Sequence, residues 1–98
     1  MTSYKVLSWR NVPLQVKARG EGRTVSAPLD GWFTEHADRI AMQAGILGSD
    51  AYLAALTWSE WTQREGSPEH VASSIAVELE SEWAERREHW IRTGELAR

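Results

Sequence analysis

Apolar and polar residues alternate through the first third of the chain, and this pattern predicts three β-strands, at residues 4–10, 14–19 and 24–29. The first strand carries apolar side chains on both faces, which is typical of a central strand. In the second strand, Leu14, Val16 and Ala18 are expected to face the core, and the side chains between them to face outward.

Turn residues separate these strands. Asn11-Val12-Pro13 predicts a turn after the first strand, because proline lacks an N–H and restricts the residue before it. The segment at 20–23 contains two glycines and favours a hairpin loop. Pro28 restricts the third strand to a sheet edge or to its own last residues.

The apolar spacing then changes to that of helices, and the polar residues at the helix boundaries fit this change. Helices are predicted at 30–45, 49–56 and 67–93, with Asp30, Ser49 and Ser67 as N-caps. Gly45 ends the first helix and Gly94 the last. The last helix has a buried stripe on one side and glutamates on the other, with Val77 as an exposed apolar exception; the stripe consists of Val71, Ile75, Leu79, Trp83 and Trp90.

Residues 57–64, with sequence TWSEWTQR, favour a further strand because threonine and tryptophan are common in strands. The competing interpretation extends the short helix through Trp61. In a strand, Trp58 and Trp61 would point to opposite faces, because their separation is odd. We then expect Trp58 to be buried and Trp61 to be more exposed; in the alternative, the terminal helix covers both rings.

Together these elements predict one α+β domain over residues 1–98. A three- to four-stranded antiparallel sheet would be packed on one face by two helices, and the short third helix would precede the last strand.

Composition narrows the classes of function. The chain has no cysteine, which excludes disulfides, a thiol nucleophile and cysteine-based zinc or iron–sulfur sites. Its first residues lack the apolar region of a signal peptide, and no apolar run approaches transmembrane length, so a cytoplasmic location is expected. The net charge of −3 is unevenly distributed: residues 1–29 hold five basic residues and one acidic residue, and the remainder holds six basic and thirteen acidic.

No motif identifies a catalytic site. A P-loop, a Gly-x-Gly-x-x-Gly turn and a Gly-x-Ser-x-Gly elbow are all missing from the sequence. Glu85 and His89 lie four residues apart on the last helix and would supply two metal ligands, but the same spacing is that of an ordinary helical contact. His36 is expected at the edge of the core with one hydrogen bond. We therefore expect no catalytic residue, no metal and no cofactor, and we do not expect an enzyme in the isolated chain.

Several segments resemble a small bacterial family named for a virulence factor. They extend from residue 4 to about residue 80 and comprise Ser8-Trp9-Arg10 with Pro13, Gln15-Val16-Lys17-Ala18-Arg19, Pro28-Leu29, Phe33, Asp38, Ala41-Met42-Gln43-Ala44-Gly45, Gly48-Ser49-Asp50-Ala51-Tyr52-Leu53, Trp58 and Arg64-Glu65-Gly66. The family name records a phenotype and carries no catalytic residues. Members tend to be encoded near one-carbon and corrinoid methyl-transfer enzymes, and the resemblance therefore implies an accessory role. The chain departs from the family pattern at His36 and in the number of tryptophans in its last helix.

The basic, tryptophan-bearing strands are the best candidate for a working surface. Arginine and tryptophan are enriched at binding hot spots, and an acidic protein partner would complement the charge. We expect a non-catalytic interaction or accessory protein whose partner-binding residues are Trp9, Arg10, Lys17, Arg19, Trp61 and Arg64. One alternative is a small subunit that completes a partner enzyme's active site. A nucleic-acid-binding module is disfavoured, because the aromatic motifs of RNA-recognition domains are missing and the domain is acidic overall. Self-association stays open.

Overall fold

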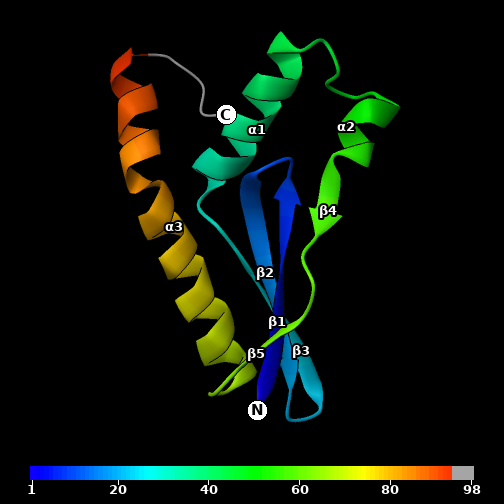
Figure 1. Ribbon diagram of the computed structural model, residues 1–98, viewed down its shortest axis with the longest axis vertical. Helices are drawn as coiled ribbons and strands as arrows, with labels where there is room; N and C mark the ends of the chain where they lie inside the picture. Colours follow the sequence, from blue (N-terminus) through cyan, green and yellow to red (C-terminus); the bar gives the residue numbers. More distant parts are fainter. Residues whose placement is uncertain (94–98) are drawn as a thin grey trace.

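The computed structural model describes residues 1–93 and has an antiparallel sheet packed by helices, as the sequence predicts (Figure 1). The elements, in chain order, are β1 (Thr2–Trp9), β2 (Val12–Gly20), β3 (Arg23–Pro28), α1 (Gly31–Gln43), α2 (Asp50–Ala54), β4 (Leu56–Trp58), β5 (Thr62–Arg64) and α3 (Pro68–Thr93). The strand order is β3-β2-β1, and both β4 and β5 pair with the far side of β1. β1 is thus an interior strand and β3 an edge strand, which suits Pro28 at its end.

The turn after β1 lies earlier than the sequence predicts. It is formed by Arg10 and Asn11, so that Val12 and Pro13 belong to β2. The register of β1 against β2 shifts between Leu7 and Ser8: Leu7 faces Gln15, whereas Ser8 faces Pro13. This irregularity accommodates the proline, which has no N–H to donate to the ladder.

The predicted fourth strand is interrupted. Val6 of β1 donates its backbone N–H to the Ser59 side-chain Oγ at 2.9 Å, and Ser59 donates its own backbone N–H to the Val6 carbonyl at 2.9 Å. The serine hydroxyl thereby replaces a backbone carbonyl at this point of the ladder. Residues 56–64 consequently form two three-residue strands, β4 and β5, with an irregular stretch between them.

The predicted helix starts are confirmed by their caps. The Asp30 carboxylate accepts the N–H of Trp32 at 2.9 Å, the Ser49 hydroxyl that of Tyr52 at 3.3 Å, and the Ser67 hydroxyl that of His70 at 3.2 Å. These bonds satisfy N–H groups that have no partner within their own helix.

One core joins the inner face of the sheet to α1 and α3. Trp9, Val12, Val16, Phe33 and Val71 are essentially inaccessible to solvent. An aromatic cluster forms where the first turns of α1 meet the C-terminal half of α3; it consists of Trp32, Phe33, His36, Trp83 and Trp90. Trp83 is only 5% exposed, as its position in the stripe predicts.

His36 lies deeper than the sequence indicates. It is fully buried, its ring stacks on Trp32 with centroids 4.5 Å apart, and neither ring nitrogen has a hydrogen-bond partner among the described residues. Burial, followed by the nearby Arg39 charge, lowers the pKa of His36 below its ordinary value. The histidine therefore packs here as a neutral aromatic ring.

Candidate partner-binding face

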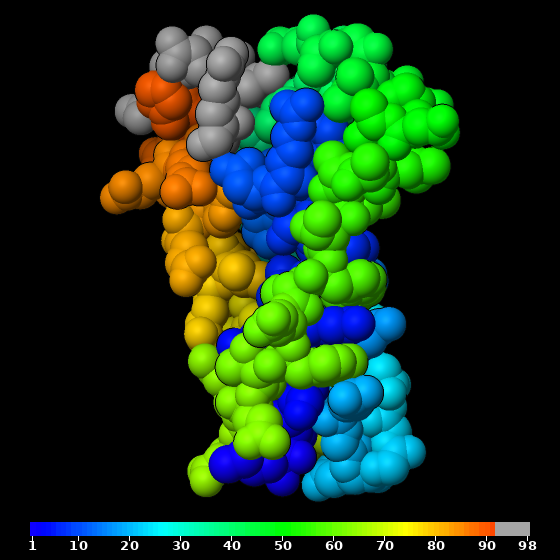
Figure 2. All heavy atoms as spheres, turned by 45° about the vertical axis from the view of Figure 1, so that its right-hand side comes forward, coloured from blue at the N-terminus to red at the C-terminus, as the bar shows by residue number. Residues whose placement is uncertain are grey.

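The outer face of the sheet, opposite the helices, brings cations and tryptophans together. The strand register places Lys5 of β1 directly opposite Lys17 of β2, Ser3 opposite Arg19, and Leu7 opposite Trp58 of β4. These residues alternate with the inward side chains of Tyr4, Val6, Val16 and Ala18, which pack in or against the core. Figure 2 turns this side forward and shows residues 56–64, in green, crossing in front of β1, in blue.

The charged groups and the rings interleave, and we call this arrangement the cation–tryptophan ladder; its members, in order, are Lys17, Trp58, Lys5, Trp61 and Arg19. The Lys17 Nζ lies 4.8 Å from the Trp58 ring centroid, and the Lys5 Nζ lies 4.7 Å from the same centroid. The Lys5 Nζ also lies 4.8 Å from the Trp61 centroid, over which the Arg19 guanidinium carbon sits at 4.0 Å. All four contacts are within the range at which a ring attracts a cation.

The ladder cations lack the acidic partners that several of the arginines have. Among the described side chains, no carboxylate lies within ion-pair distance of Lys5, Lys17 or Arg19. Arg23 by contrast contacts both Glu69 and Glu21, and Arg39, Arg64 and Arg87 each contact one carboxylate, that of Glu35, Glu78 and Asp30, respectively. Three cations on one sheet face are therefore neutralised only by ring faces and by solvent. An acidic group from another molecule would supply the missing counter-charge.

The exposure of the two tryptophans is the reverse of the sequence expectation. Trp58 is 38% exposed, and Trp61 is half-buried. Both rings lie on the same side of the sheet because the irregular stretch at Ser59 and Glu60 breaks the alternation on which the prediction depended. The alternative, in which the terminal helix covers both rings, is also wrong, since α3 packs on the opposite face.

The ladder ends at a hollow beside the β2–β3 hairpin. The hollow has a volume of about 470 Å³ and is lined by Ser3, Arg19, Gly20, Gly22, Arg23 and Thr24. Arg23 is already bound by both Glu69 oxygens, at 2.7 and 2.6 Å, and this pairing holds the pKa of Glu69 at about 2. Arg19 is thus the lining residue whose charge is available to a ligand.

Three of the six residues predicted to bind a partner lie elsewhere. Trp9 is fully buried: its Nε1 donates to the Tyr52 carbonyl at 2.9 Å, and Arg10 covers its ring with the guanidinium carbon 4.8 Å from the centroid. Arg10 lies in the β1–β2 turn, at the opposite end of the sheet from Arg19. Arg64 turns toward α3, where it pairs with Glu78 and lowers the pKa of that carboxyl. Lys17, Arg19 and Trp61 are the members that the fold brings together.

Two ladder residues were missing from the sequence-based set. Lys5 could have been identified from the alternation of side chains along the strand, because it pairs with Lys17 once the two strands are aligned. Trp58 was predicted to be buried, and only the interruption at Ser59 reveals its outward position. A single strand pattern contains no signal for that interruption.

Other kinds of site have little support within residues 1–93. This part of the chain contains no group of three or more histidine, aspartate or glutamate side chains placed to hold a metal ion. None of its helices combines the length and the apolar character needed to cross a membrane.

The chain matches the model of the family described as Virulence factor over residues 7–90, and it therefore belongs to that family. The resemblance inferred from its sequence motifs is thus confirmed. No curated protein and no solved structure matches the chain. The family description names no substrate, ligand or partner.

Proposed function

We propose that this member of the virulence factor family is a cytoplasmic, non-catalytic accessory protein that binds an acidic surface of a protein partner. The cation–tryptophan ladder would form the contact. The observation that carries the proposal is the set of three cations, Lys5, Lys17 and Arg19, that contact two tryptophan rings and have no carboxylate within ion-pair distance among the described side chains.

The ladder suits carboxylates because its cations are already positioned. Holding a lysine or arginine over a ring restricts its side chain before a partner arrives, which reduces the conformational entropy lost on binding. Binding hot spots are enriched in tryptophan and arginine side chains that lose their contact with water when the partner binds, and the ladder contains both residue types. A partner surface with two or three glutamates or aspartates would meet Lys17 and Lys5, which lie side by side on adjacent strands, and Arg19, two residues further along β2.

The same geometry argues against single-stranded nucleic acid. Base stacking needs a free ring face, and each ladder ring is covered by two cations. A base would have to displace a lysine or arginine before stacking. The cations would still attract the phosphates of a nucleic acid, so an experiment has to distinguish an acidic protein partner from a single-stranded nucleic acid.

The test compares a double charge reversal within the ladder with a single charge reversal outside it. Lys17→Glu with Arg19→Glu reverses two ladder cations, and Arg10→Glu reverses one cation in the β1–β2 turn, at the end of β2 that lies about 23 Å from Arg19. Affinity capture from the native cells, with mass spectrometry, should recover a protein partner with wild type and with Arg10→Glu, and lose it with the double variant. Recovery should fall between about 50 and 300 mM salt, because exposed charges are screened.

A single-stranded oligonucleotide tested in parallel decides between the two ligand classes. We expect no binding at about 150 mM salt. Binding of the oligonucleotide, or partner capture that survives in the double variant, would contradict the proposal.

A further inference from the structure

The side of α3 that faces away from the core carries a line of apolar and small residues. Val77 and Ile91 are 63% and 62% exposed, and Ala84, also exposed, lies midway between them. Residues seven apart fall on nearly the same side of a helix. Val77, Ala84 and Ile91 thus form one aligned apolar stripe with polar residues on both sides, the arrangement that marks an interaction surface.

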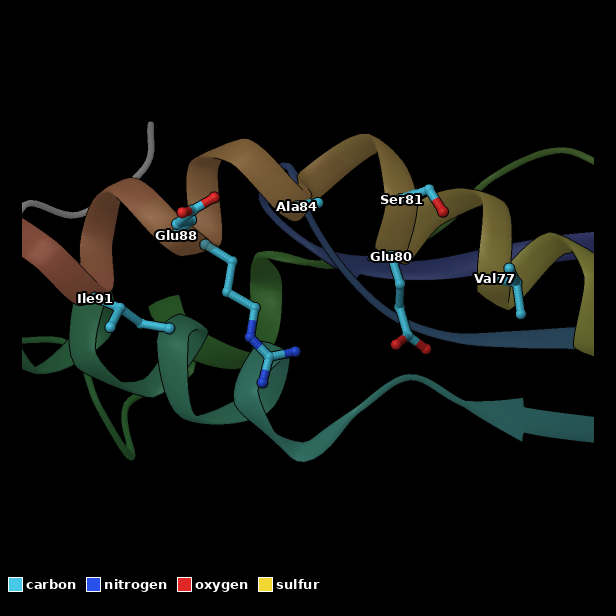
Figure 3. Close-up of a pocket in the computed structure, with 7 residues that line it drawn as sticks. Val77, Glu80, Ser81, Ala84, Glu88 and Ile91 are labelled. Atoms are coloured by element: carbon cyan, nitrogen blue, oxygen red, sulfur yellow. The ribbon is translucent and has the colours of Figure 1, made fainter.

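These residues line a groove of about 480 Å³, which we call the α3 groove; its other lining residues are Glu80, Ser81, Arg87 and Glu88 (Figure 3). All seven come from α3. Glu80 and Arg87 flank the apolar line on one side, and Ser81 and Glu88 flank it on the other, as the helical repeat of 3.6 residues requires.

The groove is complementary to itself when two copies run antiparallel. A two-fold axis beside Ala84 brings Ala84 against its own copy and Val77 against Ile91, because both lie seven residues from the centre. Rotation about this axis leaves each flank on the same side of the helix pair. The flank with Glu80 and Arg87 in one copy therefore faces the same flank of the other copy. Glu80 then meets Arg87 of the second copy, and Ser81 meets Glu88 of the second copy, each within about one residue of equal height. Every residue that lines the groove has a partner of matching character.

We propose that a second copy of this chain occupies the α3 groove, forming an antiparallel two-fold helix pair centred on Ala84. Alanine at the centre permits close approach of the two helices, and one antiparallel pair of this kind closes the assembly as a dimer. Arg87 takes part while keeping its contact to Asp30, where its Nη2 lies 3.5 Å from the carboxylate, because a guanidinium has five donors.

The groove covers about 21 Å of helix, which is short for a permanent interface. We therefore expect a weak, concentration-dependent dimer of the size class of transient complexes. The outer face of the sheet lies on the other side of the molecule, so dimerisation would leave the cation–tryptophan ladder open and would present two ladders per assembly.

The chain contains no cysteine, so a single introduced cysteine can test whether two copies of α3 pair. Helices packed at about 8–10 Å with Cα atoms at a radius of about 2.3 Å bring facing Cα atoms to about 3.5–5.5 Å. This overlaps the range of about 4.4–6.8 Å that a disulfide spans. Under mild oxidation, Ala84→Cys should form a covalent dimer at least about tenfold faster than the matched control Glu82→Cys, an exposed residue two positions away and on another side of the helix. Equal rates would overturn the proposal.

Sedimentation of the unmodified chain gives the second readout. Its average mass should rise toward that of a dimer between about 10 µM and about 1 mM, and Ala84→Lys should stay monomeric without a fall in melting temperature. Lysine is a good helix former, and at this exposed position it lies four residues from both Glu80 and Glu88, so the variant removes pairing without disturbing the fold. A chain that stays monomeric throughout, or a dimer unaffected by Ala84→Lys, would mean that another molecule or no molecule occupies the groove.

Discussion

Lys5 and Lys17 lie directly opposite each other on adjacent strands, and both ammonium groups lie within 5 Å of the Trp58 ring centroid, at 4.7 and 4.8 Å. Like charges at such a pair are destabilising in most sheets. Here the electron-rich ring attracts both cations and offsets part of their repulsion. Trp58 therefore stabilises this pair of lysines, although it is among the more exposed residues of the sheet.

A double-mutant cycle tests this role. Trp58→Ala should lower the free energy of unfolding by about 1–2 kcal/mol, because two exposed cation–ring contacts of about 0.5–1 kcal/mol each disappear. Lys17→Ala should have a small effect in wild type and become stabilising in the Trp58→Ala background, since only the repulsion from Lys5 is then left. Urea unfolding of the four proteins measures the coupling energy. Additive effects would contradict the ladder as an energetic unit.

The pair of Trp61 and Arg19 separates partner binding from folding. We expect the combined substitution Trp61→Ala with Arg19→Glu to abolish partner capture, because it removes the ring and reverses the charge at the hairpin end of the ladder. Its effect on stability should be about 1–2 kcal/mol, as for Trp58→Ala, since Trp61 also holds two cation–ring contacts, to Lys5 and to Arg19. Thermal unfolding and capture are measured on the same preparation. Loss of the folded state, or capture at the wild-type level, counts against the site.

Much of the fold follows from local pattern. The hairpin of β2 and β3 was predicted from alternation around a two-glycine loop, and the three helix starts from capping residues whose hydrogen bonds are present in the structure. These features depend on residues close together in the chain. Strand pairing of β1 with residues 56–64 depends on contacts more than forty residues apart, and there the prediction was coarser.

The candidate site shows the same division. Lys17 and Arg19 were correctly placed on one face by parity within a single strand. The orientation of Trp58 and Trp61 was wrong because Ser59 bonds to Val6, fifty-three residues away, and interrupts the strand. Trp9 was expected at the surface because of its neighbour Arg10, yet Tyr52 supplies both a carbonyl and a ring against it. Each error arises from a long-range contact that no local spacing encodes.

Trp83 provides a direct measure of core packing. Its ring lies against Phe33 with centroids 5.9 Å apart and against Trp32 at 6.5 Å. Trp83→Ala should reduce the free energy of unfolding by about 3–5 kcal/mol, the range for removing a buried aromatic side chain. Trp58→Ala is the control for losing an exposed tryptophan. A loss below about 1 kcal/mol in chemical denaturation would mean that Trp83 contributes little to the core.

His36 should make stability depend on pH near neutrality. Burial lowers its pKa in the folded chain below the ordinary value of 6.5, so the unfolded chain binds a proton more readily than the folded one. The stabilisation associated with the neutral ring is therefore fully present above about pH 6.5 and declines as pH falls from there through the folded-state pKa. Glu69 and Glu78, whose pKa values are lowered by Arg23 and Arg64, lose their contribution to stability only below about pH 4.5 and do not interfere in this pH range.

Urea unfolding at pH 7.5 and pH 5.5 measures this dependence. The free energy of unfolding should fall between the two pH values for wild type and fall less for His36→Leu, which keeps an apolar group of similar size among Trp32, Trp83 and Trp90. The same loss in both proteins would refute the role of His36.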